Sequence, residues 1–282
     1  MKLRGEKLKE IRKRKGLSQA ALAEGICTQA SVSLMEKQNR IPKMGILTAI
    51  CDRLGIKTED IIAVDDAGFD KKFDRVANLI VSQQFKTAEQ LLKSINVKDL
   101  EGDYYKQRYY YMLGTVQVGL NQLDDAIFNF ELVLTQFSTS AANIILAMTT
   151  IGMAEAYVKL GSKDRAQRLV ERAVGMIDNK KVTASNREWI LAYYHLAELQ
   201  LQLGQPQQAI TMAKRGTQLC KQNNSLLMLD DYYRCLGKGY AALNDKKAAT
   251  ENLQLARSLT LVRQRPELTA EIDSDMRQLN AG

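Results

Sequence analysis

The segment 28–40 carries polar and basic side chains whose types and spacing suit contact with the edges of DNA bases. Val32 and Met35 are three residues apart, as on the buried side of a helix, which leaves Gln29 and Ser33 on the outer side. A glutamine amide pairs with adenine through two hydrogen bonds, a serine hydroxyl meets several base edges, and an alanine contacts a thymine methyl group. Nearby Lys or Arg side chains reach phosphates. The predicted contacts on this helix are Gln29, Ala30, Ser33, Lys37 and Arg40.

Short helices are predicted to hold this face outward. A first helix over residues 2–15 buries its apolar side and leaves its basic residues on the solvent side. Ser18 is expected to cap a second helix, so that Gln19 stands in its first turn, where a side-chain amide can bind a phosphate oxygen. Gly25 allows a sharp turn, and Thr28 caps the third helix. Gln19 and Thr28 therefore join the predicted DNA contacts.

Two further helices complete the predicted front domain. Pro42 is expected to start a fourth helix, because proline is tolerated in the first turn. Thr58 is expected to cap a short fifth helix that ends near Val64. The fourth helix is expected to close the core with Leu47, Ile50, Cys51 and Leu54.

The order LSQ, LA, a glycine turn, QxxVS and LxxICxxLGI resembles the Xre/Cro-type helix-turn-helix family over about residues 4–64. The resemblance implies a dimer that reads DNA with its third helix in the major groove. Leu34 departs from the family, because many members carry a basic or polar residue there. For any single side chain the alternative is a solvated helix face, but the whole pattern favours DNA binding. The family's contact positions fall on Gln19, Thr28, Gln29, Ala30 and Ser33.

Charge and composition narrow the class of protein. The first 16 residues hold eight Lys or Arg and two Glu, which is +6 of the overall +8, so attraction to a polyanion belongs to the N-terminus. No apolar stretch approaches the length of a membrane span, and no signal peptide is present, so a cytoplasmic protein is expected. The four cysteines lack metal-ligand spacing and the chain has one histidine, so neither a metal nor a cofactor is predicted.

Behind the front domain, alanines recur at separations of 38, 40, 43 and 40 residues. Small residues precede four of them by twelve positions, and a Leu-Asn or Leu-Gly pair marks a helix-ending turn between the two. The pattern resembles tetratricopeptide repeats with lengthened helices over about residues 69–262, and Pro266 is expected to open a capping helix to Leu279. The recurring alanines are Ala88, Ala126, Ala166, Ala209 and Ala249.

An all-α chain of two domains is therefore predicted. The front domain covers residues 1–64, an acidic linker covers 65–70, and a right-handed superhelix of helical hairpins covers 71–282. In such repeats the first helix of each pair forms a concave wall that holds peptides or partner segments. The side chains expected on that wall are Arg108, Tyr111, Thr115, Ile151, Glu155, Tyr194, His195, Glu198, Asp231, Arg234 and Lys238.

This domain order resembles the peptide-responsive quorum-sensing regulators of Gram-positive bacteria, the RRNPP group, and the stretch EGICTQASVSLMEKQ resembles its PlcR-like branch. The resemblance implies a homodimer that reads an inverted repeat and is controlled by a short oligopeptide pheromone. Asparagines that grip peptide backbone are common on the wall of that group, but those sites fall here on Ile151 and His195. The peptide is therefore gripped differently, or none binds.

Two other functions are weighed against a peptide-controlled regulator. One is a peptide-independent phage or mobile-element repressor whose repeats only dimerise or dock another protein. The other is an enzyme, which the sequence disfavours, because His195 has no nucleophile or carboxylate at triad spacing and no glycine loop follows a strand. The protein is predicted not to be an enzyme.

Overall fold

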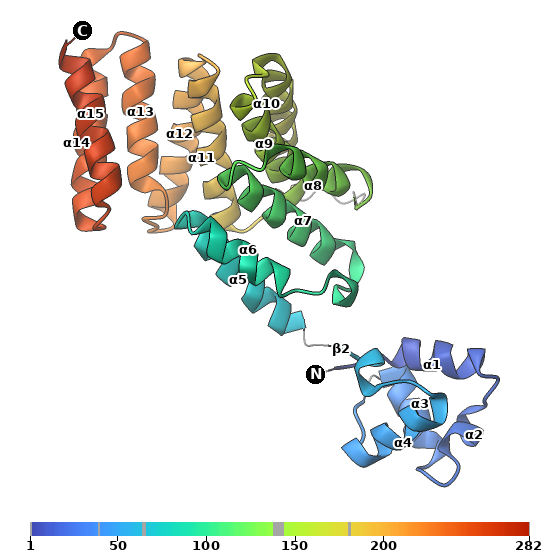
Figure 1. Cartoon of the computed structure of the whole chain (residues 1–282). Helices are drawn as coiled ribbons and strands as arrows, with labels where there is room; N and C mark the ends of the chain where they lie inside the picture. Colours follow the sequence, from blue (N-terminus) through green and yellow to red (C-terminus); the bar gives the residue numbers. More distant parts are fainter. Residues whose placement is uncertain (1, 39, 64–65, 138–143, 180–181, 282) are drawn as a thin grey trace. The chain divides into compact units, whose positions relative to one another are not determined.

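A computed structural model describes residues 2–38, 40–63, 66–137, 144–179 and 182–281. The chain forms two compact units (Figure 1). Unit 1 comprises Met1–Asn78 and Ser94–Leu100, and unit 2 comprises Leu79–Lys93 and Glu101–Gly282. The predicted all-α architecture is confirmed, since helices make up both units, and the sheet found among the described residues pairs two residues with two.

Unit 1 begins with four helices that share one apolar core. Every residue expected to close this core from the fourth helix is buried, and so are Val32 and Met35 on the third. Ser18 caps α2 as predicted, because its Oγ accepts a hydrogen bond from Ala21 N at 3.0 Å. Gly25 turns the chain at φ 70°. The helices are α1 (Gly5–Arg14), α2 (Gln19–Ala23), α3 (Gln29–Gln38) and α4 (Met44–Leu54).

Three boundaries in unit 1 differ from the prediction. The expected first helix starts only at Gly5, because β1 (Lys2–Leu3) pairs antiparallel with β2 (Ile62–Ala63). That pairing also removes the fifth α-helix, leaving a 3-10 turn, η1 (Thr58–Asp60). The fourth helix begins at Met44, not at Pro42. Val64, the expected end of the fifth helix, lies outside the described residues.

The segment predicted as a linker is largely helical. Helix α5 (Asp66–Val81) begins inside it, and Phe69 is 5% exposed. Phe69 therefore has a packing role that the acidic composition of the segment did not indicate. The predicted domain boundaries stay predictions.

The remaining helices follow one another as antiparallel hairpins (Figure 1). They are α6 (Phe85–Lys93), α7 (Gly102–Gly119), α8 (Leu123–Thr135), α9 (Ile144–Lys159), α10 (Lys163–Ile177), α11 (Asn186–Gln202), α12 (Pro206–Gln222), α13 (Leu229–Ala242), α14 (Lys246–Val262) and α15 (Pro266–Ala281), with a 3-10 turn η2 (Val97–Asp99) before α7.

The repeat register read from the sequence is confirmed in the packing. All five recurring alanines are 0% exposed, because each sits where the two helices of a hairpin meet. Asn121, Gly161, Gly204 and Asn244 have φ between 60° and 75°, the left-handed conformation expected of the turn residues. At Gly114 an added Cβ would lie 2.5 Å from the Phe130 ring, so only glycine fits there.

The first helices of the hairpins form one continuous layer. Successive members α7, α9, α11 and α13 contact one another, and α15 contacts α13. Within the described parts of the chain, the second helices α8, α10, α12 and α14 make no contact of similar extent among themselves. Closer spacing on one side curves the array toward that side, so the first helices line its inner face.

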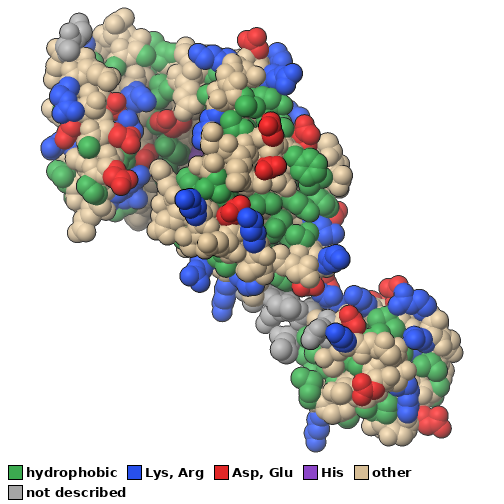
Figure 2. All heavy atoms as spheres, viewed as in Figure 1, with side chains coloured by type: hydrophobic (Ala, Val, Ile, Leu, Met, Phe, Trp, Pro, Cys, Tyr) green, Lys and Arg blue, Asp and Glu red, His purple; other side chains and the backbone are tan. Residues whose placement is uncertain are grey.

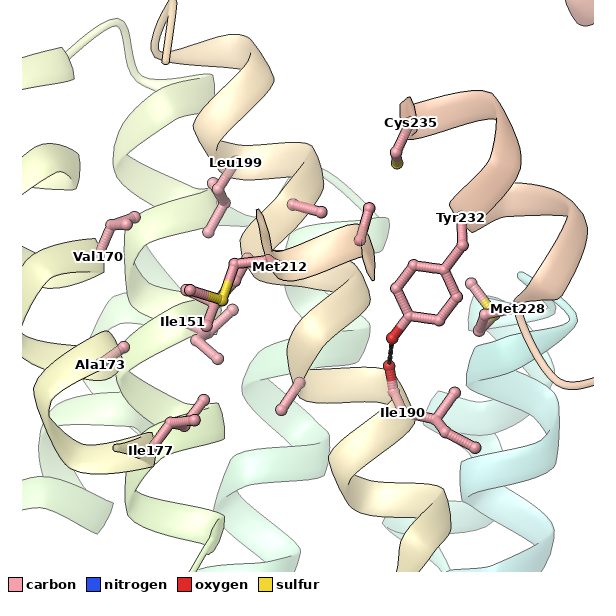
Figure 3. Close-up of a cluster of buried hydrophobic side chains, with 14 of the residues drawn as sticks. Ile151, Val170, Ala173, Ile177, Ile190, Leu199, Met212, Met228, Tyr232 and Cys235 are labelled. Carbon is pink, nitrogen blue, oxygen red and sulfur yellow. Dashed lines mark hydrogen bonds between the residues drawn. The ribbon is translucent and has the colours of Figure 1, made fainter. Parts of the chain in front are cut away.

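The centre of unit 2 is tied together by Tyr232 on α13. Its ring lies against Gly216 on α12, where an added Cβ would be 1.9 Å from the ring. Its hydroxyl donates a hydrogen bond to the carbonyl oxygen of Ile190 on α11 (Figure 3). Tyr232 is 0% exposed and lies in the largest apolar cluster given by the described residues, where it connects three successive helices.

Candidate functional site

The outer face of α3 is exposed as predicted. Gln29, Ala30 and Lys37 are exposed, Ser33 and Leu34 are half-buried, and Val32 and Met35 point into the core. The Oγ1 of Thr28 accepts a hydrogen bond from Ser31 N at 3.2 Å, which supports its predicted role as the cap of α3. Arg40 is exposed just beyond the helix. A helix presented in this way fits a DNA major groove.

A buried ion pair holds α3 against α1. Arg12 donates from Nε to Oε1 of Glu36 at 2.5 Å and from Nη2 to Oε2 at 2.9 Å. Its Nη1 also donates to the carbonyl oxygen of Leu17 at 2.7 Å. The expectation that every basic residue of the first helix lies in solvent is therefore wrong for Arg12, which is 7% exposed because Glu36 compensates its charge.

Hydrogen bonds connect this ion pair to two of the predicted DNA contacts, Gln19 and Gln29. Gln19 Nε2 donates to Oε2 of Glu36 at 2.8 Å, and Gln29 Nε2 donates to Oε1 of Gln19 at 2.7 Å. Each amide nitrogen carries two hydrogens, so Gln29 retains one N–H and its Oε1 for a base. The chain of hydrogen bonds fixes the orientation of Gln29, which a lone exposed glutamine would not have.

Glu36 is ionised in this arrangement. Burial raises the pKa of its carboxyl group, but hydrogen bonds from Arg12 and Gln19 and the charge of Arg12 outweigh burial, so the pKa is lowered. The hydrogen bond to Glu36 likewise raises the pKa of Arg12. Glu36 and Arg12 are 24 residues apart in the sequence, so their pairing was visible only in the fold.

A hollow on the inner face of unit 2 brings together five of the side chains predicted on the wall. They come from three first helices, α7, α9 and α11, and are joined by Met148, Gly152 and Ala192. The space in the hollow is about 10 Å³, which is room for about one water molecule. We call it the α9 hollow. The five predicted residues are Tyr111, Thr115, Ile151, Glu155 and His195.

Glu155 and His195 form the polar edge of the α9 hollow. His195 Nδ1 lies 2.6 Å from Glu155 Oε1, and their side chains are 30% and 23% exposed. Burial lowers the pKa of His195, but the charge and hydrogen bond of Glu155 and the charges of Glu198 and Asp231 outweigh it, so the pKa is raised. His195 therefore stays protonated to a higher pH than an isolated histidine does.

Other predicted wall residues lie outside the α9 hollow and have partners of their own. Glu198 Oε1 lies 2.7 Å from the thiol of Cys235. Arg234 donates to Asp275 Oδ2 on α15 at 2.6 Å and also pairs with Glu271. The structure does not bring the following residues to the hollow: Arg108, Tyr194, Glu198, Asp231, Arg234 and Lys238.

The side chain of Asp231 is not open to a ligand on the inner face, because it belongs to a buried cluster of ion pairs. Arg265 Nη1 lies 2.6 Å from Asp231 Oδ2 and 3.0 Å from Asp230 Oδ2, and Arg263 also pairs with Asp230. Asp231 is 6% exposed. Repeat register assigned Asp231 to the inner face, but it gave no sign of the arginines between α14 and α15 that cover it.

Sequence reasoning missed two small residues of the α9 hollow, Gly152 and Ala192. At Gly152 an added Cβ would lie 2.6 Å from the Phe130 ring. The ring of Phe130 therefore fills the space that a side chain at Gly152 would take. Repeat register gave no signal for either small residue.

Metal chemistry and membrane insertion find no support in the described residues. No cluster of three or more His, Cys, Asp or Glu side chains suited to a metal ion occurs among them. All four cysteines are free. No helix in the described ranges is long and apolar enough to cross a membrane.

Comparisons with known proteins agree with this organisation. A family model for helix-turn-helix domains matches residues 8–61, and one for tetratricopeptide repeats matches residues 107–136 and 190–223. A search of curated proteins finds no match. The helix-turn-helix match supports a DNA-binding transcription regulator, in agreement with the prediction that the chain is not an enzyme.

Solved structures with the same fold cover nearly the whole chain. Bacillus thuringiensis PlcR in complex with the peptide PapR7 and DNA has a TM-score of 0.65 and 17% identity, covering 96% of this chain and 99% of PlcR. The apo form of the competence regulator ComR from Streptococcus vestibularis has a TM-score of 0.57 and 15% identity, covering 98% and 97%. The chain thus contains segments that match helix-turn-helix domains and tetratricopeptide repeats, and it shares the fold of the regulators PlcR and ComR.

Proposed function

We propose that the protein is a sequence-specific transcription regulator whose hold on DNA is controlled by a short peptide bound at the α9 hollow. The observation that carries the proposal is the convergence of five predicted wall residues from three helices on one opening of the inner face. PlcR, which shares the fold, has been solved with a peptide and DNA together.

The regulator acts as a homodimer in the cytoplasm on an inverted-repeat operator. One α3 covers only a few base pairs, whereas two related by a twofold axis read two half-sites and multiply the discrimination. The exposed face of α3 and the fixed amide of Gln29 supply the reading surface in each protomer.

The α9 hollow suits a ligand that changes the conformation of unit 2. With room for about one water molecule, it admits a side chain only if α7, α9 and α11 move apart. A ligand that binds the widened form better than the closed form shifts the equilibrium between them. Moving from about 1:99 to 99:1 takes about 5.5 kcal/mol of differential binding, so contacts from several residues of the ligand are needed.

The test is to sequence the genomic fragments that the purified protein retains with and without synthetic peptides encoded by short reading frames beside its gene. The proposal expects one enriched inverted repeat whose retention changes with one peptide. Retention that no peptide alters would favour the peptide-independent repressor, and the absence of any enriched sequence would overturn both.

Variants separate the α9 hollow from the rest of the inner face. Tyr111→Ala is expected to abolish the response to the peptide, because Tyr111 lines the hollow. Arg234→Ala is the comparison, since its guanidinium is already held by α15. An equal loss of response in both variants, with the fold intact by circular dichroism, would place the ligand elsewhere on the face.

A further inference from the structure

Two rows of basic side chains flank the buried side of α1. Gly5, Leu8, Ile11 and Arg12 are the buried residues of this helix. Successive residues of an α-helix are about 100° apart, so residues four or seven positions apart share a side. The row beside Arg12 consists of Lys9 and Lys13, and the row beside Ile11 consists of Lys7 and Arg14.

Lys9 and Lys13 lie on the side of α1 from which Arg12 reaches α3. By helical geometry they are roughly 60° to 100° around the helix from Arg12, in the direction away from Ile11. Lys9 is also near enough to Glu36 on α3 for its charge to favour the ionised form of that carboxyl group, a smaller effect than those of burial and Arg12. Lys9 therefore lies beside the ion pair of Arg12 and Glu36, and Lys13 follows one turn later on the same side of the helix.

Both lysines are free to take an external partner. Lys13 is exposed and, within the residues that the structure describes, makes no ion pair. Lys9 pairs with Glu6 at 3.2 Å, with side chains 37% and 80% exposed. An exposed pair of this kind contributes little to stability, so Lys9 can exchange Glu6 for another anion at small cost. Figure 2 shows Lys and Arg side chains along the edge of unit 1 that α1 forms in this view.

We infer that Lys9 and Lys13 bind the phosphate backbone of the DNA beside the bases that α3 contacts. A phosphodiester backbone is a regular row of negative charges, and lysine reaches it as a point charge on a flexible stem. The contact extends the predicted interface from α2 and α3 onto α1. The inference rests on the proposed DNA binding, but it needs no knowledge of the operator.

The experiment measures the affinity of the full-length protein for a short duplex of mixed sequence at several salt concentrations. Lys9→Gln/Lys13→Gln removes the row beside Arg12, and Lys7→Gln/Arg14→Gln removes the same charge from the other row of the same helix. The first pair is expected to reduce the slope of log K against log salt by about 1.8, because each phosphate contact contributes about 0.9. The second pair is expected to leave the slope unchanged.

Further variants test whether a reduced slope could arise from a change in overall charge or from misfolding. Lys9→Arg/Lys13→Arg is expected to retain the wild-type slope, and the thermal midpoint of each variant checks the fold. An equal reduction in both rows, or none in either, would overturn the inference while DNA binding by the wild type stands. A wild type that ignores duplex DNA at low salt would overturn the proposed function itself.

Discussion

The two candidate sites of this protein differ in how far apart in sequence their residues lie. The DNA contacts predicted on α2 and α3 fall within a segment of little more than twenty positions, and one buried ion pair supports them. The α9 hollow draws its residues from three helices that are about 40 positions apart. A site within one local segment keeps its geometry when the rest of the chain changes, whereas a site shared among repeats depends on the spacing of the whole array.

The largest effect is expected from breaking the ion pair under α3. Glu36→Ala leaves Arg12 charged and buried, so we expect the free energy of unfolding of unit 1 to fall by about 3 to 5 kcal/mol. Hydrogen exchange measured in both units would locate the loss. Arg12→Met/Glu36→Leu removes both charges and is expected to recover most of the stability. A double variant as unstable as the single one would contradict the role assigned to the pair.

The same pair gives unit 1 a defined response to acid. The pKa of Glu36 is lowered in the folded state, so its contribution to stability is complete above the pKa of the unfolded chain and is lost as pH falls through the folded value. The stability of the wild type relative to Arg12→Met/Glu36→Leu, measured by urea unfolding, should therefore fall at acid pH. A constant difference would contradict the assigned charges.

A smaller effect is expected from the outer face of α3, and it separates specificity from general affinity. Gln29→Ala or Ser33→Ala should reduce discrimination between the operator and mixed sequence by about 1 to 3 kcal/mol. Lys37→Ala should weaken binding to both duplexes alike and flatten the salt dependence. Competition binding with the two duplexes measures both quantities. Equal losses on the two duplexes for Gln29→Ala would remove it from base reading.

The smallest effect is expected at the edge of the α9 hollow. His195 is the one histidine of the chain, so its ring signals in NMR are unambiguous. Glu155→Gln should lower the pKa of His195 and cost unit 2 about 1 kcal/mol or less, because the pair is partly exposed. Because the pKa of His195 is raised in the folded protein, the stability lost in Glu155→Gln should be measurable at pH 6 and should disappear at high pH. An unchanged titration would show that Glu155 does not control His195.

These differences also explain what the sequence could predict. Capping residues, glycines and apolar spacing predicted the cap at Ser18, the turn at Gly25 and the buried face of α3, because each depends on residues within one or two helical turns. The regular alanine spacing predicted the repeats for a similar reason. Pairings between distant segments were missed, including the β1–β2 strand pair that replaced a predicted helix.

The residues predicted on the inner wall of unit 2 show more clearly that pairings between distant segments cannot be predicted from local sequence. Repeat register assigned Arg234 and Asp231 to the inner face, but ion-pair partners outside the repeat pattern decide whether their side chains are available to a ligand. The arginines that cover Asp231 lie in the connection between α14 and α15, where no repeat pattern applies. The residues of the α9 hollow were predicted because their neighbours are other first helices of the same array.

The contacts of Tyr232 affect the order in which the helices of unit 2 unfold. Repeat arrays in which each hairpin touches only the next can fray one hairpin at a time. Here one side chain on α13 fills the place of a missing Cβ on α12 and is hydrogen-bonded to α11, so losing α13 would uncover both. The segment from α11 to α13 should accordingly melt as a single cooperative block, with fraying confined to the hairpins outside it.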